Sequence, residues 1–166
     1  MKLLDVRKFA SPETYISGMT ALSIPDAGRI GGDWHFIAAL CRPNSRIQSA
    51  GANGNMANTN AFLGQRMIAD KAEVLRRRGI DLGTATHVFC ATHPRAIADL
   101  LYNSLAKDIY PAHVAVDGGI FEEDIEFAML DELMKRMAPH LTARQLENLL
   151  RWKSEHFAPV KDGVAA

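Results

Sequence analysis

The fold class is decided by the stretch from residue 87 to residue 101, which reads HVFCATHPRAIADLL. Its first five residues are mostly apolar, and their number suits a short buried strand. Thr92 or His93 can cap a helix that follows, and Pro94 suits the first turn, where the missing N–H of proline is not needed. Apolar residues then recur at helical spacing, at Ile97, Leu100, Leu101 and Leu105. This pattern predicts a strand that leads directly into an amphipathic helix.

Further helices are predicted from their start and stop signals. A short one runs from Ser11, as N-cap, to Gly18, and a long one covers residues 61–78, with Gly79 just after its end. Residues 122–137 carry acids early and bases late, which complements the helix dipole, and Pro139 ends this helix. The last helix has a capping box formed by Thr142 and Gln145, and its apolar face includes Leu146, Leu149, Leu150 and Phe157.

Two more strands are predicted in the first third of the chain. Residues 34–41 and 47–50 flank a turn, which is typical of a hairpin, and the Gly- and Asn-rich residues 51–60 form a loop. Strands followed by helices, without regular alternation, favour an α+β domain. We expect a small, mostly antiparallel sheet packed against about four helices, a helical C-terminal half, one domain over residues 1–158, and a flexible tail over 159–166.

Composition excludes several classes of protein. The 166 residues are 48% hydrophobic and have a formal net charge of zero. A neutral chain argues against coating of nucleic acid or anionic membrane, and it is compatible with self-association as a homo-oligomer. The sequence has no signal peptide and no apolar run of membrane-spanning length, so the cytoplasm is expected. Cys41 and Cys90 lie in apolar segments and are interpreted as buried core thiols.

The sequence offers one pair of catalytic candidates. Asp33 and His35 flank Trp34 at a loop-to-strand junction, where a histidine could act as a general base and the aspartate could orient another group. The alternative is that Trp34 fills the core, or contacts a partner, while its neighbours anchor the turn. No histidine pair has metalloprotease spacing and no cysteine pair has zinc-finger spacing, so no metal or other cofactor is expected.

Charged residues in two helices have competing interpretations. Arg76, Arg77 and Arg78 end the helix over 61–78, either as a solvated complement to its dipole or as a contact to nucleic acid. Arg95 and Asp99 lie one turn apart and are predicted to pair on the polar surface of their helix, where they could also contact a partner.

The helix over residues 122–137 has an unusually wide apolar arc. It is formed by Ile125, Phe127, Met129, Leu130, Leu133, Met134 and Met137. A wide arc is typical of a well-buried helix, but methionine-rich arcs also suit adaptable partner grooves. Met129, Met134 and Met137 are therefore candidates for partner binding.

Part of the opening stretch resembles a known family. The short strand followed by Thr92, Arg95, Ala96, Ile97, Asp99, Leu100 and Leu101 is similar to a segment of AbiEi-type antitoxins, whose partners are nucleotidyltransferase toxins. The resemblance covers about 15 of the 166 residues. Typical members also begin with a winged helix-turn-helix that binds DNA, and the first 60 residues here show no such pattern.

What the resemblance implies is the partner-binding half of such a protein. We therefore expect a non-enzymatic, antitoxin-like protein that binds a protein partner, of the nucleotidyltransferase-toxin type if the resemblance holds. The alternatives are a small hydrolase or transferase that uses Asp33 and His35, and a nucleic-acid-binding protein that acts through Arg76, Arg77 and Arg78.

Overall fold

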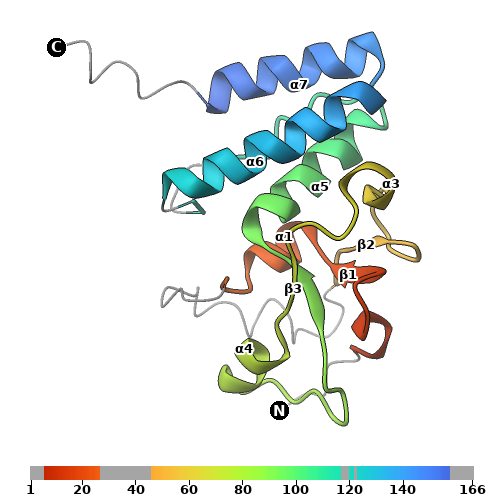
Figure 1. Ribbon diagram of the computed structural model, residues 1–166, viewed down its shortest axis with the longest axis vertical. Coiled ribbons are helices and arrows are strands. Elements are labelled where there is room, and N and C mark those ends of the chain that lie inside the picture. Colours follow the sequence, from red (N-terminus) through yellow and green to blue (C-terminus); the bar gives the residue numbers. More distant parts are fainter. Residues whose placement is uncertain (1–5, 27–45, 117–119, 122, 158–166) are drawn as a thin grey trace, which may run out of the picture.

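A small mixed sheet and a stack of three long helices form the structure, a computed structural model (Figure 1). It describes residues 6–26, 46–116, 120–121 and 123–157. The sheet order is β2-β1-β4-β3, and its strands are β1 (Thr14–Ile16), β2 (Ser49–Gly51), β3 (Ile68–Asp70) and β4 (Phe89–Ala91). The β1–β2 and β3–β4 pairs are antiparallel and the β1–β4 pair is parallel, so the predicted mostly antiparallel α+β sheet is confirmed.

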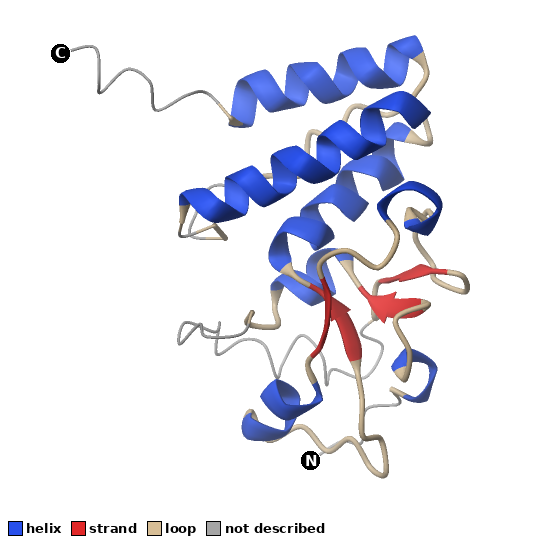
Figure 2. Ribbon diagram, viewed as in Figure 1, coloured by secondary structure: helices blue, strands red, loops and turns tan. Residues whose placement is uncertain are grey.

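Six α-helices lie within the described ranges, where about four were expected (Figure 2). They are α1 (Gly18–Leu22), α3 (Asn60–Leu63), α4 (Ala72–Arg77), α5 (His93–Leu105), α6 (Asp124–Met137) and α7 (Ala143–His156), with 3₁₀ turns η1 (Arg7–Phe9) and η2 (Ala138–His140). The extra helices are short ones near the sheet. In Figure 1, α5, α6 and α7 lie side by side above the sheet, so the C-terminal half is helical as predicted.

The strand–helix unit of residues 87–105 is present as predicted. β4 leads into α5. Thr92 is the N-cap residue of α5, and Pro94 lies in the first turn of this helix. The predicted stripe is buried, with Ile97, Leu101 and Leu105 fully covered. α5 packs against α1 and α6, so it is enclosed on several sides and forms the centre of the molecule.

The predicted capping box of the last helix is also confirmed, and the helix predicted over residues 122–137 begins two residues later. Thr142 and Gln145 form the capping box at the start of α7, and α6 begins at Asp124 with a second box formed by Glu123 and Glu126. The inward side of α7 carries Leu149 and Trp152. The indole N–H of Trp152 donates to the carbonyl of Val114 at 2.9 Å. Leu150, predicted on the apolar face, is 56% exposed.

The predicted helix from Ser11 to Gly18 is wrong. Thr14–Ile16 forms the strand β1, with all three residues buried, and Gly18 begins α1 instead of ending a helix. Threonine, tyrosine and isoleucine suit a buried strand, and here the pairing of β1 with two neighbours overrides the local Ser-Pro signal. The predicted strand over 47–50 appears as β2, two residues later, paired with β1. Its predicted hairpin partner, 34–41, lies outside the described residues, as does the tail 159–166.

The predicted helix over residues 61–78 is also wrong. Only the ends of this segment are helical, as α3 and α4, and β3 lies between them. Gly64 and Met67 both have φ of 58°, which no continuous right-handed helix allows. Gly79, at φ 82°, does follow the end of α4 as predicted.

Gly51 is expected to tolerate no side chain. Its φ is +93°, and a Cβ there would lie 2.0 Å from the carbonyl oxygen of Glu13. Gly64 is a matched control, because its φ is +58° but its Cβ would meet only the end of the Arg66 side chain, at 3.3 Å. Gly64→Ala should lower the free energy of unfolding by about 1–3 kcal/mol through backbone strain alone, and Gly51→Ala by clearly more. Urea denaturation followed by circular dichroism measures both, and equal losses would contradict the close approach of β1 and β2.

Candidate functional site

Arg95 and Asp99 do pair, as predicted, but their predicted surface position is wrong. The Arg95 Nε lies 3.1 Å from Asp99 Oδ1, and both side chains are fully buried. The sequence places them on the polar side of α5, and this side faces β1 and the 59–66 segment instead of solvent. Neither side chain can touch a partner in this structure, so their role in the described fold is internal.

The carboxylate of Asp99 accepts four hydrogen bonds. Oδ1 accepts from Thr59 Oγ1 at 2.7 Å and from Arg95 Nε at 3.1 Å. Oδ2 accepts from Tyr15 OH at 2.8 Å and from Ser17 Oγ at 2.7 Å. A buried carboxylate is tolerated only when it is paired and hydrogen-bonded, and here both oxygens meet that condition.

The guanidinium of Arg95 holds the turn after α3. Its Nη1 donates to the carbonyls of Gly64 at 2.9 Å and Arg66 at 2.7 Å. Its Nη2 donates to Tyr15 OH at 2.9 Å, Thr59 Oγ1 at 3.0 Å and Asn60 Oδ1 at 3.1 Å. A helix through this segment would turn those two carbonyls toward its own N–H groups, so the arginine gives a physical reason for the break between α3 and β3.

Burial of the network also changes the protonation chemistry of Tyr15. Its removal from solvent, together with the nearby charge of Asp99, raises the pKa of Tyr15 far above its ordinary value. The phenol therefore stays neutral and donates to Asp99 throughout the physiological range. The central side chains of the network, those of Tyr15, Ser17, Thr59, Arg95 and Asp99, are fully buried. We therefore interpret the network as a structural element that positions other parts of the molecule.

A second polar cluster lies at the start of α5 and is partly accessible. It is formed by Asp26, Lys71, His93 and Glu126, which come from four separate segments of the chain. Lys71 Nζ lies 2.6 Å from Asp26 Oδ1, and its side chain is 3% exposed. The backbone N–H of His93 donates to Asp26 Oδ2 at 3.0 Å, so a distant carboxylate caps α5.

The ring of His93 faces two carboxylates. Its Nε2 lies 2.8 Å from the carbonyl oxygen of Ile24, and its Nδ1 lies 3.9 Å from Asp26 Oδ2. One oxygen or nitrogen atom from each of Asp26, His93 and Glu126 lies within 4.8 Å of the other two. Sequence reasoning missed this cluster, because it examined histidine pairs at fixed spacing and these residues come together only through the fold.

The other predicted site residues are distributed over the molecule. Asp33, Trp34 and His35 lie outside the described residues, so their proposed catalytic or binding roles stay predictions. Arg76 and Arg77 end α4, as predicted, and Arg78 follows as its C-cap residue. Arg77 pairs with Glu73, and Arg76 donates to the carbonyl of Ala85. Binding of nucleic acid by these arginines also stays a prediction.

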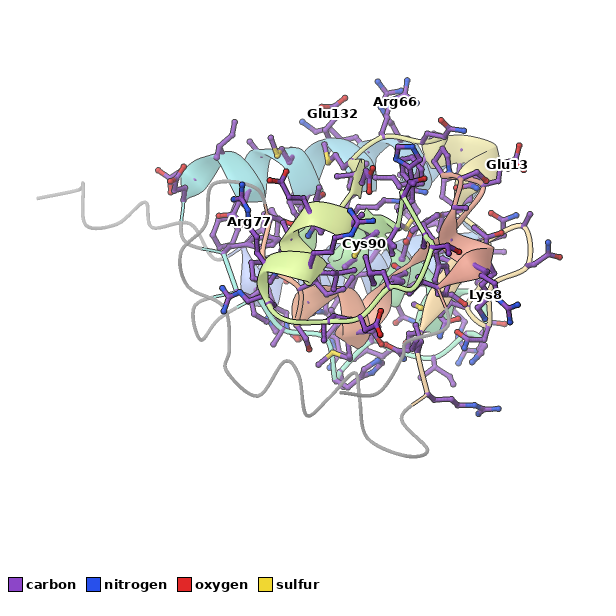
Figure 3. All side chains as sticks on the ribbon, turned by 90° about the horizontal axis from the view of Figure 1, so that it is seen from below. Lys8, Glu13, Arg66, Arg77, Cys90 and Glu132 are labelled. Atoms are coloured by element: carbon purple, nitrogen blue, oxygen red, sulfur yellow. The ribbon has the colours of Figure 1, made fainter. Side chains whose placement is uncertain are left out.

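Cys90 is a buried thiol, as predicted, while Cys41 lies outside the described residues. The Cys90 side chain is fully buried, and this burial raises the pKa of its thiol to about 11. In Figure 3 it lies well inside the outline of the molecule, whereas Arg66 and Glu132 project outward. A protonated, covered thiol is a poor nucleophile, so Cys90 belongs to the core.

Comparisons with protein-family models, with curated proteins and with solved structures found no match for this chain. No helix among the described residues combines the length and the apolar character that crossing a membrane requires.

The Asp99 carboxylate is expected to be essential for stability. Asp99→Asn removes the charge that compensates a fully buried Arg95, so the free energy of unfolding should fall by about 3–5 kcal/mol. Glu132→Gln is the matched control, because Glu132 forms an ion pair of the same i, i+4 spacing with Arg136 on the exposed surface. That control should lose less than about 1 kcal/mol. Similar losses for the two variants in urea denaturation would show that the Arg95–Asp99 pair is not buried in solution.

The raised pKa of Tyr15 predicts a specific alkaline instability. Tyr15 stabilises the fold fully below the ordinary tyrosine pKa of about 10, and this contribution is lost as pH rises above it, because only the unfolded state ionises freely. Above the pKa that Tyr15 has in the unfolded chain, its ionisation there lowers the free energy of unfolding by about 1.4 kcal/mol per pH unit. Unfolding free energies measured between about pH 9 and 12 should fall less steeply in Tyr15→Phe, although that variant starts lower. If the free energy of unfolding fell equally steeply with pH in the unmodified chain and in Tyr15→Phe, the raised pKa of Tyr15 would be contradicted.

Proposed function

We propose that this chain is a non-enzymatic, partner-binding protein and that α6 presents its contact surface. The observation that carries the proposal is an apolar stripe on the outer side of α6, formed by Ile125, Ala128 and Met129. Ile125 is 52% exposed and Met129 38% exposed, and Ala128 between them is exposed as well. These residues lie at helical i, i+3 and i+4 spacing, so they share one side of the helix.

The inner side of α6 explains why its apolar arc is so wide. Leu130, Leu133, Met134 and Met137 are buried in the core, so two of the three methionines predicted as partner contacts serve internal packing. Met129 remains as the exposed methionine of that set. A helix that packs with one side and exposes apolar side chains on the other suits insertion into a hydrophobic groove.

The resemblance to AbiEi-type antitoxins suggests the kind of partner. Among the residues that carry it, Arg95, Ala96, Ile97, Asp99, Leu100 and Leu101 are buried. These positions would preserve the strand–helix unit, and the partner would meet a different surface, for which α6 is the choice that exposure favours. The proposed role is thus antitoxin-like, with a nucleotidyltransferase-type toxin as the proposed partner class.

Site-specific cross-linking tests the contact surface. A photoreactive phenylalanine analogue is placed at Met129 or, as control, at Leu150, which is 56% exposed on α7. The chain is expressed together with the product of the gene beside its own. We expect a heterologous cross-link from position 129 and none from position 150, since the proposed contact surface lies on α6. An equal yield from position 150, or a cross-link only to a second copy of the chain, would contradict the proposal.

Charge substitution provides the matching loss of function. The double variant Ile125→Glu with Met129→Glu should abolish co-purification with the partner, because two carboxylates cannot enter an apolar groove unpaired. Its stability should change by less than about 1 kcal/mol, since both positions are exposed. Leu150→Glu should leave co-purification intact. Retained binding in the double variant, with its fold verified by circular dichroism, would remove α6 from the interface.

A further inference from the structure

We propose that Asp26, His93 and Glu126 bind a divalent first-row transition-metal ion such as Zn²⁺. Asp26 follows α1, His93 is the first residue of α5, and Glu126 lies in the first turn of α6. One imidazole nitrogen and two carboxylate oxygens are ligands that such ions accept. The ion would connect three segments that are distant in the sequence.

The tautomer of His93 favours a metal at its other nitrogen. Nε2 lies 2.8 Å from the Ile24 carbonyl oxygen, which can only accept, so Nε2 carries a hydrogen and donates. In the neutral ring the lone pair is then on Nδ1. Nδ1 lies 3.9 Å from Asp26 Oδ2, which is too far for a hydrogen bond. Metal-binding histidines have this arrangement, in which the second ring nitrogen donates to a backbone carbonyl or carboxylate.

Each of the two carboxylates is also fixed by a contact to a group that is not a proposed metal ligand. Lys71 Nζ lies 2.6 Å from Asp26 Oδ1, which leaves Oδ2 on the side of His93. Glu126 Oε1 accepts the backbone N–H of Glu123 at 3.2 Å in the capping box of α6. Ligands that are fixed by such outer contacts lose little freedom when an ion binds. All three proposed ligands, His93, Asp26 and Glu126, have such an outer contact, which distinguishes this site from a surface cluster of acids.

The distances and charges are compatible with an ion of this size. The three ligand atoms lie within 4.8 Å of one another. Bonds of about 2.0–2.2 Å keep ligand atoms roughly 3–4 Å apart, so small side-chain rotations bring them into range. The two carboxylates and the Lys71 ammonium together leave one net negative charge at the site, which favours a cation. The competing arrangement is a doubly protonated His93 between the carboxylates, with no ion.

Binding of metal to the full chain separates these two arrangements. The chain is stripped with a chelator and titrated with Zn²⁺ by calorimetry, and Co²⁺ is added as a spectroscopic probe of the ligand field. We expect one equivalent to bind with micromolar or tighter affinity. The imidazole resonances of His93 should shift on its Nδ1 side. Absence of one-equivalent binding, or a shift on the Nε2 side, would overturn the proposal.

Three variants test the assignment of ligands. His93→Gln and Glu126→Gln should each weaken Zn²⁺ binding at least tenfold, and Glu126→Gln keeps a carbonyl oxygen for the capping box. His87→Gln is the control, because His87 also faces a carboxylate, with Nδ1 2.6 Å from Asp70 Oδ2. That pair is already hydrogen-bonded and belongs to no group of three metal-ligating residues within the described part of the chain. Circular dichroism verifies the fold of each. Equal weakening by His87→Gln, or unchanged affinity in either ligand variant, would contradict the site.

Discussion

The buried ion pair of Arg95 and Asp99 constrains the arrangement of everything around it. Removal of two charges from water is unfavourable by several kcal/mol per ion, and the attraction between them offsets this only with further hydrogen bonds. Those bonds come from β1, from residues 59–66 and from Ser17. Because every donor and acceptor must be in place together, the pair specifies which segments of the chain can be neighbours of α5.

The same constraint explains the strand order β2-β1-β4-β3 of the sheet. Arg95 uses the carbonyls of Gly64 and Arg66, so the chain leaves the helical path after Leu63 and can extend as β3 beside β4. On the other side of β4, Tyr15 reaches the ion pair from β1, which pairs with β4 in parallel. The polar network and the sheet therefore stabilise the same arrangement of strands, and the helix α5 carries the residues that join them.

The two polar clusters near α5 differ in what they can do. The Arg95 and Asp99 side chains are fully buried and hydrogen-bonded, so their network positions the segments around it. The cluster of Asp26, Lys71, His93 and Glu126 lies at the start of α5 and is partly accessible. The Nδ1 atom of His93 lies near carboxylate oxygens of this cluster but is too far from Asp26 for a hydrogen bond. α6 joins this cluster to the outer surface, since Glu126 belongs to the cluster and Ile125 beside it begins the exposed stripe.

The sequence by itself determined the elements whose signals are local. The strand–helix unit of residues 87–105, the capping box of α7 and the glycine after α4 depend on contacts within a turn or two, and all were predictable. Only the tertiary structure decided that residues 14–16 form a strand, that residues 61–78 are interrupted, and that Arg95 and Asp99 are buried. The physical reason is that distant partners supply the deciding hydrogen bonds: Arg95 reaches back to Gly64, and Asp26 caps His93 across 67 residues of sequence.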